Sequence, residues 1–294
     1  MSLHIHAAIL TAHGVAANNR GLTEGNITTL QKLVWETGRV HSTVSAEAIR
    51  FALRRQFQEA GEALNRTYDE NSRSNAWADH EFKAWDKHLD DDLLGFMSAK
   101  AAGEEGEKNT KVRRSALEVT RAVSLSPWLG DATFNAASPG ATPSAQKKGA
   151  NPVPYGTEMH ATRFQYALSL TPDHLKEKER AAKALRALCA LGPVAGNHAR
   201  FLFDFSPESI IIRVTEDAAP RLLYTFGQQD GGEVNMNALI QKVRQKDIDP
   251  AGLFIGGPVL MGLDADARSL LGISDINLGV KSACEGALKK AGLA

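Results

Sequence analysis

Two periods of hydrophobic and polar positions alternate along this chain of 294 residues. Short apolar runs, many of them rich in β-branched residues, predict strands. Longer stretches with apolar positions three and four residues apart predict amphipathic helices. The predicted strands span 4–11, 115–128, 160–171, 209–215 and 220–226, and the predicted helices span 44–60, 173–192, 234–248 and 282–293. This mixture of elements predicts an α+β fold.

A hydroxyl cluster begins the first predicted helix. Thr43 is expected to be its N-cap, between Ser42 and Ser45, because a side-chain oxygen there accepts bonds from free backbone amides. Arg50 and Arg54 follow, and their spacing of four residues gives them one helix face. Hydroxyls and free amides at a helix N-terminus bind anions, most often phosphate. An ordinary capped surface helix with solvated arginines has the same pattern, so the segment alone leaves both interpretations open.

Three stretches interrupt the regular pattern. Residues 12–29 are rich in Gly, Asn and Thr and are expected to form a long loop. From residue 61 the chain becomes acidic, and apolar residues at helix-like steps predict a small helical insertion that ends near residue 115. Residues 130–157 have no period and are either a disordered linker or an extended arm that orders on a ligand. Strand-like sequence resumes directly afterwards, which favours the arm.

The helix predicted at 173–192 has Asp173 as its expected cap and Gly192 at its end. Its apolar stripe includes Cys189. This cysteine and Cys284 each lie in a helix-like stretch, so both are expected to be buried and reduced.

Charge is balanced overall but unevenly distributed. The 34 basic and 34 acidic residues give a formal net charge of zero, which argues against a generic basic coat for nucleic acid. Arginines predominate in 38–55 and acids in 69–92, so a basic face beside an acidic face is expected. The amino terminus lacks the pattern of a signal peptide, and no stretch is apolar enough to span a membrane. These observations predict a cytoplasmic protein.

Without the insertion and the arm, the order of elements is βαββαβ, which is the ferredoxin-like (RRM-like) order. Modules of this kind often bind single-stranded RNA on one sheet face. The predicted division is a core of 1–60, 116–130 and 158–294, an insertion of 61–115 and an arm of 131–157.

Four ordered blocks carry a family resemblance, at 18–26, 38–54, 113–141 and 197–213. Through them the chain resembles the backbone subunit of type I CRISPR surveillance complexes (Cascade), in the DevR/Cst branch of subtype I-B and the RAMP superfamily. The resemblance implies a ferredoxin-like palm, a helical fingers insertion and a protruding thumb. It further implies that copies of the chain form a filament along one guide RNA, which pairs with target DNA, while other Cascade subunits cap the filament ends. Neither a cofactor nor a catalytic residue is implied.

The same resemblance assigns RNA contacts to the palm's helix start, to the first loop, to a Gly-rich loop and, with the weakest match, to the thumb, where Phe134 is a further candidate. The residues carried over are Arg20, Asn26, Arg39, His41, Ser42, Thr43, Ser45, Arg50, Arg54, Lys147, Lys148, Asn197, His198 and Arg200. Such groups would hold the phosphate backbone without reading base identity, as a subunit that accepts any guide requires.

Two other functions compete with this interpretation. A metal-dependent hydrolase or nuclease is suggested by the His4 and His6 pair, but no H-E-x-x-H motif accompanies it, and the two are expected to be ordinary strand histidines. The aspartates at 90–92 are expected to form a solvated face or a subunit contact. A DNA-binding autoregulator is the second alternative, although the sequence has no helix-turn-helix pattern.

Overall fold

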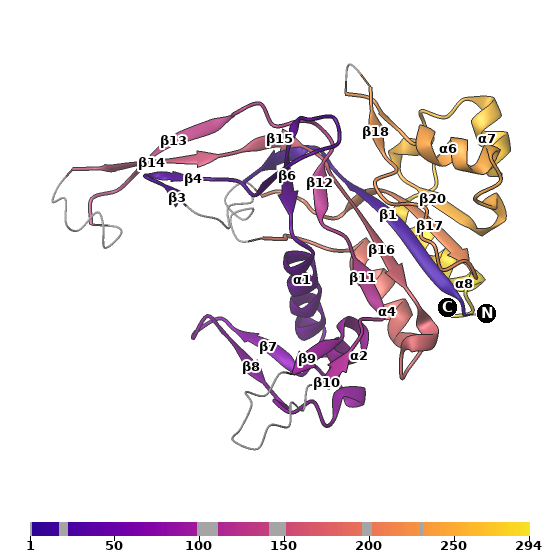
Figure 1. Ribbon diagram of the computed structural model, residues 1–294, viewed down its shortest axis with the longest axis horizontal. Helices are drawn as coiled ribbons and strands as arrows, with labels where there is room; N and C mark the ends of the chain where they lie inside the picture. The colour runs from indigo at the N-terminus through magenta and orange to yellow at the C-terminus, as the bar shows by residue number, and fades with distance from the viewer. Residues whose placement is uncertain (1, 18–22, 99–110, 141–150, 196–201, 230–231) are drawn as a thin grey trace.

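The computed structural model describes residues 2–17, 23–98, 111–140, 151–195, 202–229 and 232–294, and it is built around one large antiparallel sheet (Figure 1). The strand order is β20-β17-β1-β16-β12-β6-β5, and β11 also pairs with β16. The strands are β1 (His4–Thr11), β5 (Lys32–Val34), β6 (Val40–Val44), β11 (Leu117–Val119), β12 (Ala122–Ser124), β16 (Phe164–Leu170), β17 (Pro207–Thr215) and β20 (Leu253–Gly256).

Strand β1 lies at the centre of the sheet, between β16 and β17. Its alternate side chains enter two different cores, with Ile5 and Ile9 in one and Ala8 and Leu10 in the other. A strand that is buried on both faces needs an apolar side chain at nearly every position. The continuous apolar run at 4–11 therefore predicted this strand correctly, and the run at 209–215 predicted β17 in the same way.

Helices cover both faces of the sheet. On the face of Ile5 and Ile9 the core includes side chains of α1 (Ala46–Glu59), α4 (Glu179–Cys189) and α8 (Val280–Lys290). On the opposite face it includes side chains of α6 (Asn237–Arg244) and α7 (Ala265–Leu271). Both cysteines are buried, as expected, and they come from α4 and α8. Among the helices that the structure describes, none is long and apolar enough to cross a membrane.

Two predicted helix starts are wrong. Strand β6 continues through Val44, which pairs with Ala122, so Thr43 lies in the sheet and Ser45 becomes the cap, accepting from the amide of Ala48 at 3.2 Å. Helix α4 begins only at Glu179. Asp173 lies instead in a 3-10 turn, where its carboxylate accepts from Lys178 and from the backbone of Leu3.

In its described residues, 61–98 and 111–115, the insertion is mostly not helical, contrary to the prediction. It contains two hairpins around one short helix, and its turns are held by aspartates such as Asp79, whose carboxylate accepts from the amides of Glu81 and Ala84. Hydrogen bonds of this kind favour turns over helix. Its elements are β7 (Arg66–Asp69), β8 (Ser74–Trp77), η1 (Trp85–Lys87), α2 (Leu89–Leu94), β9 (Phe96–Ser98) and β10 (Lys111–Arg113).

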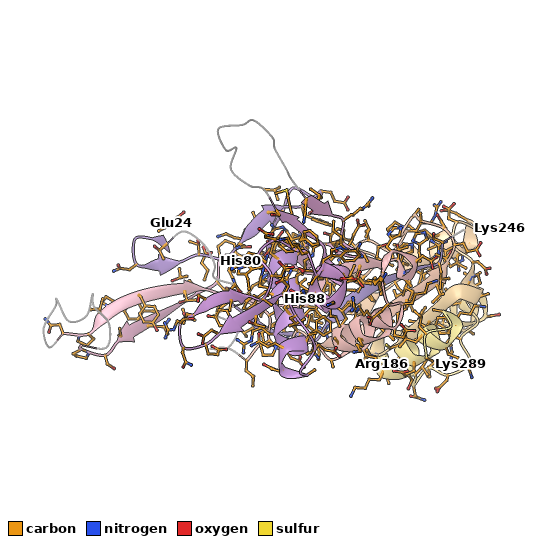
Figure 2. The ribbon with its side chains drawn as sticks, turned by 90° about the horizontal axis from the view of Figure 1, so that it is seen from below. Glu24, His80, His88, Arg186, Lys246 and Lys289 are labelled. Atoms are coloured by element: carbon orange, nitrogen blue, oxygen red, sulfur yellow. The ribbon has the colours of Figure 1, made fainter. Side chains whose placement is uncertain are left out.

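A second projection is the arm, a long hairpin that extends away from the sheet (Figure 1). In the turned view, Glu24 lies on the arm side of the molecule and Lys246 and Lys289 lie at the other end (Figure 2). The described parts of 130–157 are therefore an arm, whereas 12–29 is more structured than expected because its strands pair with the arm and its base. These strands are β2 (Gly14–Ala16), β3 (Thr23–Glu24), β4 (Ile27–Thr28), β13 (Ala132–Ala137), β14 (Val153–Glu158) and β15 (His160–Thr162).

The remaining elements lie mainly in the C-terminal part of the chain. The strand predicted at 220–226 is absent from this described segment, since Arg221 and Tyr224 have positive φ angles of 55° and 51°, which interrupt an extended backbone. The other short elements are η2 (Pro172–His174), β18 (Gly227–Gln228), β19 (Val234–Asn235), η3 (Pro250–Gly252) and η4 (Pro258–Leu260).

Candidate RNA interface

The junction between β6 and α1 is the centre of the predicted site. Ser45 caps the helix, and Arg50 follows on the second turn. The Nε atom of Arg50 is buried and has no hydrogen-bond partner among the described residues, and no ion pair to its guanidinium is found there. A buried donor without a partner costs free energy, about 1–3 kcal/mol in proteins, and points to a missing acceptor. Arg50 is therefore a candidate for an anion that the isolated chain lacks.

Arg54 has a different environment, although it lies one turn further along the same helix face. Its Nε is 3.4 Å from a carboxylate oxygen of Asp90, in the insertion. Burial lowers the pKa of Arg54, and the nearby positive charge of Arg66 lowers it further. The Arg54 charge is thus used inside the fold, and its assignment to RNA stays a prediction.

The hydroxyl cluster faces inward rather than toward solvent. Ser42 is fully buried, and its Oγ is 2.8 Å from Nδ1 of His160 at the base of the arm. His41 is 5% exposed, and its Nδ1 donates to the carbonyl oxygen of Ser124 at 2.7 Å. Thr43 is 1% exposed. These three residues join β6 to β12 and to the arm, and their direct contact with RNA stays a prediction.

Burial also lowers the pKa of His160 to about 4, so this imidazole is neutral in the folded protein at pH 7. A neutral ring has one donor and one acceptor nitrogen. It can therefore bond the Ser42 hydroxyl on one side and approach Ser126 Oγ, 3.4 Å from Nε2, on the other. The network ties the arm to the sheet without a buried charge.

Two predicted contacts are exposed. Arg39 lies on the tight turn between β5 and β6, and no ion pair of its guanidinium is found in the described part of the chain. Asn26 is exposed on the arm, where its carbonyl accepts from the amide of Gly156 at 2.8 Å. Phe134 is 81% exposed on β13. The remaining predicted contacts lie outside the described residues, namely Arg20, Lys147, Lys148, Asn197, His198 and Arg200.

Arg121 lies beside β6, with its guanidinium on the sheet face away from α1, and did not figure among the predicted contacts. It is exposed at the start of β12, and its Nη1 donates to Thr43 Oγ1 at 3.2 Å and to the Gln31 side chain at 3.4 Å. No acid pairs with it among the described residues. Its proximity to β6 follows from the pairing of β12 with β6, which the local sequence does not reveal.

The expectation for the aspartates at 90–92 is wrong. All three are at most 4% exposed at the start of α2. Asp90 accepts from the amides of Asn65 and Arg66, whereas Asp92 accepts from Arg113 and Arg180. The run is buried because these donors on neighbouring elements satisfy the carboxylates, as buried acids require.

Asp91 is the least compensated of the three. Burial and the adjacent charge of Asp90 raise its pKa to about 7, and only a hydrogen bond from the Asn65 side chain and nearby arginines oppose this. The neighbouring His88 ring is 3.7 Å from its carboxylate.

The histidine pair on β1 is also accounted for by the fold. The rings of His4 and His6 stack with centroids 5.7 Å apart, as expected for one strand face. Nδ1 of His4 is 2.9 Å from the hydroxyl of Thr171, and His6 Nε2 bonds the carbonyl oxygen of Asp217. Within the described residues there is no group of three or more His, Cys, Asp or Glu side chains with metal-binding geometry.

Solved structures share this fold. One chain of a CRISPR RNA-guided surveillance complex in a pre-nicking state aligns over 98% of this chain and 100% of its own length, with a TM-score of 0.60 and 12% identity. A chain of another CRISPR RNA-guided surveillance complex covers 87% of this chain and 88% of its own, with a TM-score of 0.51 and 16% identity. The overall fold is thus shared with chains of such complexes.

Sequence comparison identifies the family to which the chain belongs. A family model described as CRISPR-associated negative auto-regulator DevR/Csa2 matches residues 8–230. The CRISPR-associated protein Cas7/Cst2/DevR of Myxococcus xanthus (strain DK1622) is 61% identical over 298 residues, which cover 99% of this chain and 98% of the relative. The chain therefore belongs to the DevR/Csa2 family of CRISPR-associated proteins, and the resemblance noted in the sequence is confirmed.

Proposed function

We propose that this chain is a non-catalytic backbone subunit of a CRISPR surveillance complex, which binds the guide RNA and leaves its bases free to pair with target DNA. Its 61% identity over nearly full length to a Cas7/Cst2/DevR protein carries the proposal. The β6–α1 surface supports it, because three arginines there have no acidic partner among the described residues. These are Arg39, Arg50 and Arg121.

The chemistry of this surface suits a sequence-independent contact. Guanidinium groups hold phosphates and position a strand without reading its bases. Arg39 and Arg121 flank β6, and Arg50 lies on the helix that β6 enters. Arg39 and Arg121 therefore place positive charge near the two ends of β6, and Arg50 places it on the second turn of the helix that follows.

The architecture supports the division into palm, fingers and thumb. The strand order β17-β1-β16-β12, with α1 between β1 and β12 and α4 between β16 and β17 along the chain, supports a ferredoxin-like palm. We assign the palm to 1–60, 116–130 and 158–294, the fingers to 61–115 and the thumb to 131–157. Copies of the chain would stack along the guide, with other Cascade subunits at the ends of the filament. Subtype I-B and a cytoplasmic location belong to the same proposal.

Filter binding of single-stranded RNA at graded salt tests the proposal. We expect tight binding to RNAs of unrelated sequence, with a log–log salt slope of roughly −0.7 for each phosphate contacted. The triple variant Arg39→Ala, Arg50→Ala and Arg121→Ala should flatten that slope by about 2. The matched control is Arg186→Ala, which removes an exposed arginine that pairs with Glu285 on the C-terminal side of the molecule (Figure 2).

Three results would contradict the proposal. One is binding of a single RNA sequence only, and another is no RNA binding at all. The third is metal-dependent cleavage of the RNA, which would favour the hydrolase instead.

A further inference from the structure

A cleft of about 780 Å³ lies next to the proposed RNA surface. Its floor includes Val123 and Gln165, which are paired across β12 and β16. Gln165 is also opposite Leu10, whose side chain lies in the core under α6 and α7. Directly paired residues of antiparallel strands share a face of the sheet. The cleft is therefore on the face away from α1, between the turn at 35–39 and the loop at 223–228.

Three aromatic side chains line this cleft, those of Trp35, Tyr224 and Phe226. The rings of Trp35 and Tyr224 have centroids 5.0 Å apart and planes at 79°. The Trp35 ring also lies 6.1 Å from the ring of His41, at an angle of 46°, and Trp35 and Tyr224 both border the cleft. Both residues are half-buried, so their ring surface is accessible while their backbones are held. Aromatic faces of this kind are the usual platform for an unstacked nucleobase.

The loop that carries Tyr224 is strained and firmly held. Arg221 and Tyr224 both have left-handed backbones, with φ of 55° and 51°. The loop is fixed from both sides, since the Tyr224 hydroxyl donates to the carbonyl oxygen of Arg121 at 2.9 Å and the amide of Phe226 donates to the Gln165 side chain at 3.2 Å. Non-glycine residues keep such conformations only where the surroundings enforce them, and these positions cluster at binding sites.

Polar groups complete the cleft. Nδ1 of His41 must carry the ring proton, because it bonds the carbonyl oxygen of Ser124, which can only accept. The His41 side chain also borders the cleft. Arg39 lies at the rim without an acidic partner among the described residues, and Glu36 is the acid of the lining. The cleft thus combines aromatic rings, a free cation and groups that can bond a base edge.

We propose that this cleft binds one nucleotide of a single-stranded RNA, with the base against Trp35 and Tyr224 and its phosphate at Arg39. The inference rests on the proposed RNA-binding function and adds a base-stacking site to a surface that otherwise holds phosphates. Its volume is within the range of about 300–1,000 Å³ typical of small-ligand sites. Stacking accepts every base, so the site is compatible with guides of any sequence.

Photocrosslinking tests where the base lies. A 12-nucleotide RNA that carries 4-thiouridine, irradiated with the full-length protein and digested for mass spectrometry, should give adducts on Trp35 or Tyr224. Free 4-thiouridine monophosphate at the same concentration should give far fewer. If the free nucleotide labels these residues and the RNA does not, the site does not belong to an RNA strand and the inference is wrong.

Variants measure the contribution of stacking. Trp35→Leu should weaken RNA binding about 5- to 150-fold, the range for loss of one stacked base, whereas Trp35→Phe should restore most of it. Tyr224→Phe keeps the ring and should bind nearly as well as the wild type. The control Trp77→Leu changes a half-buried tryptophan in the insertion and should leave affinity unchanged. Circular dichroism spectra identify any variant that fails to fold, and the presence or absence of adducts on Trp35 and Tyr224 in the wild type then decides.

The two proposals fail in different ways. If the wild type does not bind RNA, the proposed function is wrong and the cleft has no role of this kind. If the wild type binds RNA while Trp35→Leu binds equally well and no adduct maps to the cleft, only the stacking site is wrong. Adducts on Trp35 or Tyr224, together with loss of affinity in Trp35→Leu alone, support the site.

Discussion

The two halves of helix α1 each carry one arginine of the same basic pattern, but the surroundings of the two arginines differ. Arg50 and Arg54 lie one turn apart on one face of the helix. The C-terminal half of α1 meets the insertion, where Asp90 pairs with Arg54, while the N-terminal half meets no acid among the described residues (Figure 1). Spacing alone therefore does not separate a cation that holds a fold together from one that is free for a ligand. The tertiary neighbour decides, and it leaves Arg50 as the better candidate for phosphate.

The insertion is attached through the same acidic run. Asp92 has no exposed surface and accepts from Arg113 in the insertion, from Arg180 in α4 and from the backbone of Lys176. One carboxylate thus joins the insertion to a helix of the core. A charge run in the sequence that looked like a solvated face is in the structure a joint between two parts of the molecule.

The largest expected effect follows from breaking this joint. Asp92→Ala removes the buried partner of Arg180, which keeps only the exposed Glu177, and loss of one partner of a buried pair costs about 3–5 kcal/mol. Urea unfolding should show this loss. The control is Asp69→Ala, which removes an exposed carboxylate from a hairpin turn and should cost well under 1 kcal/mol. Similar midpoints for the two variants would mean that the acidic run does not hold the insertion.

Local pattern predicted the parts of this fold whose surroundings are uniform. Strand β1 is buried on both faces, so its apolar run identifies it from sequence. The apolar stripe of α4 likewise identifies a helix from sequence, because the helix needs only a core on one side to bury it. Helix caps failed because they depend on distant partners: β6 extends through Val44 only because β12 pairs with it.

The candidate site shows the same limit. Arg50 and Arg39 could be selected from the sequence as basic residues beside a helix start. Arg121 could not, since it reaches Thr43 through a strand pairing between residues 78 positions apart. Nor could the sequence show that Ser42 and Thr43 face inward, because that follows from the packing of the arm base against β6.

Two buried titratable groups, Asp91 in α2 and His160 at the arm base, should make stability depend on pH in opposite directions. The raised pKa of Asp91 means that the folded state binds a proton more tightly than the unfolded state. Asp91 therefore makes stability fall as pH rises from about 4 to about 7. The lowered pKa of His160 changes stability in the opposite direction, so that stability rises with pH. Its contribution is fully present above pH 6.5 and is lost as pH falls toward 4.

These opposite contributions should nearly cancel in the wild type between pH 4 and 6.5. Asp91→Asn removes the first, so its stability should rise with pH in this window and exceed that of the wild type at pH 8 by about 2–4 kcal/mol. His160→Gln removes the second, and its stability should fall with rising pH. Urea unfolding at several pH values measures both slopes. Parallel profiles for the two variants would show that neither group titrates as its environment indicates.

Variants of Arg50 and Arg54 should change stability least, and they test the contrast along α1 most directly. Arg54→Ala should cost about 1–2 kcal/mol of stability, because Asp90 loses a partly buried partner, and a double-mutant cycle with Asp90→Asn should show the coupling. Arg50→Ala should not lower the free energy of unfolding, because the side chain has no partner to lose among the described residues and its removal relieves the cost of a buried unpartnered donor. RNA affinity should follow the reverse order, with roughly a 10- to 150-fold loss for Arg50→Ala, equal for all sequences, as expected for one hydrogen bond to a charged phosphate. Equal losses of affinity for the two variants would assign both arginines to the RNA, and the contrast along α1 would then concern stability alone.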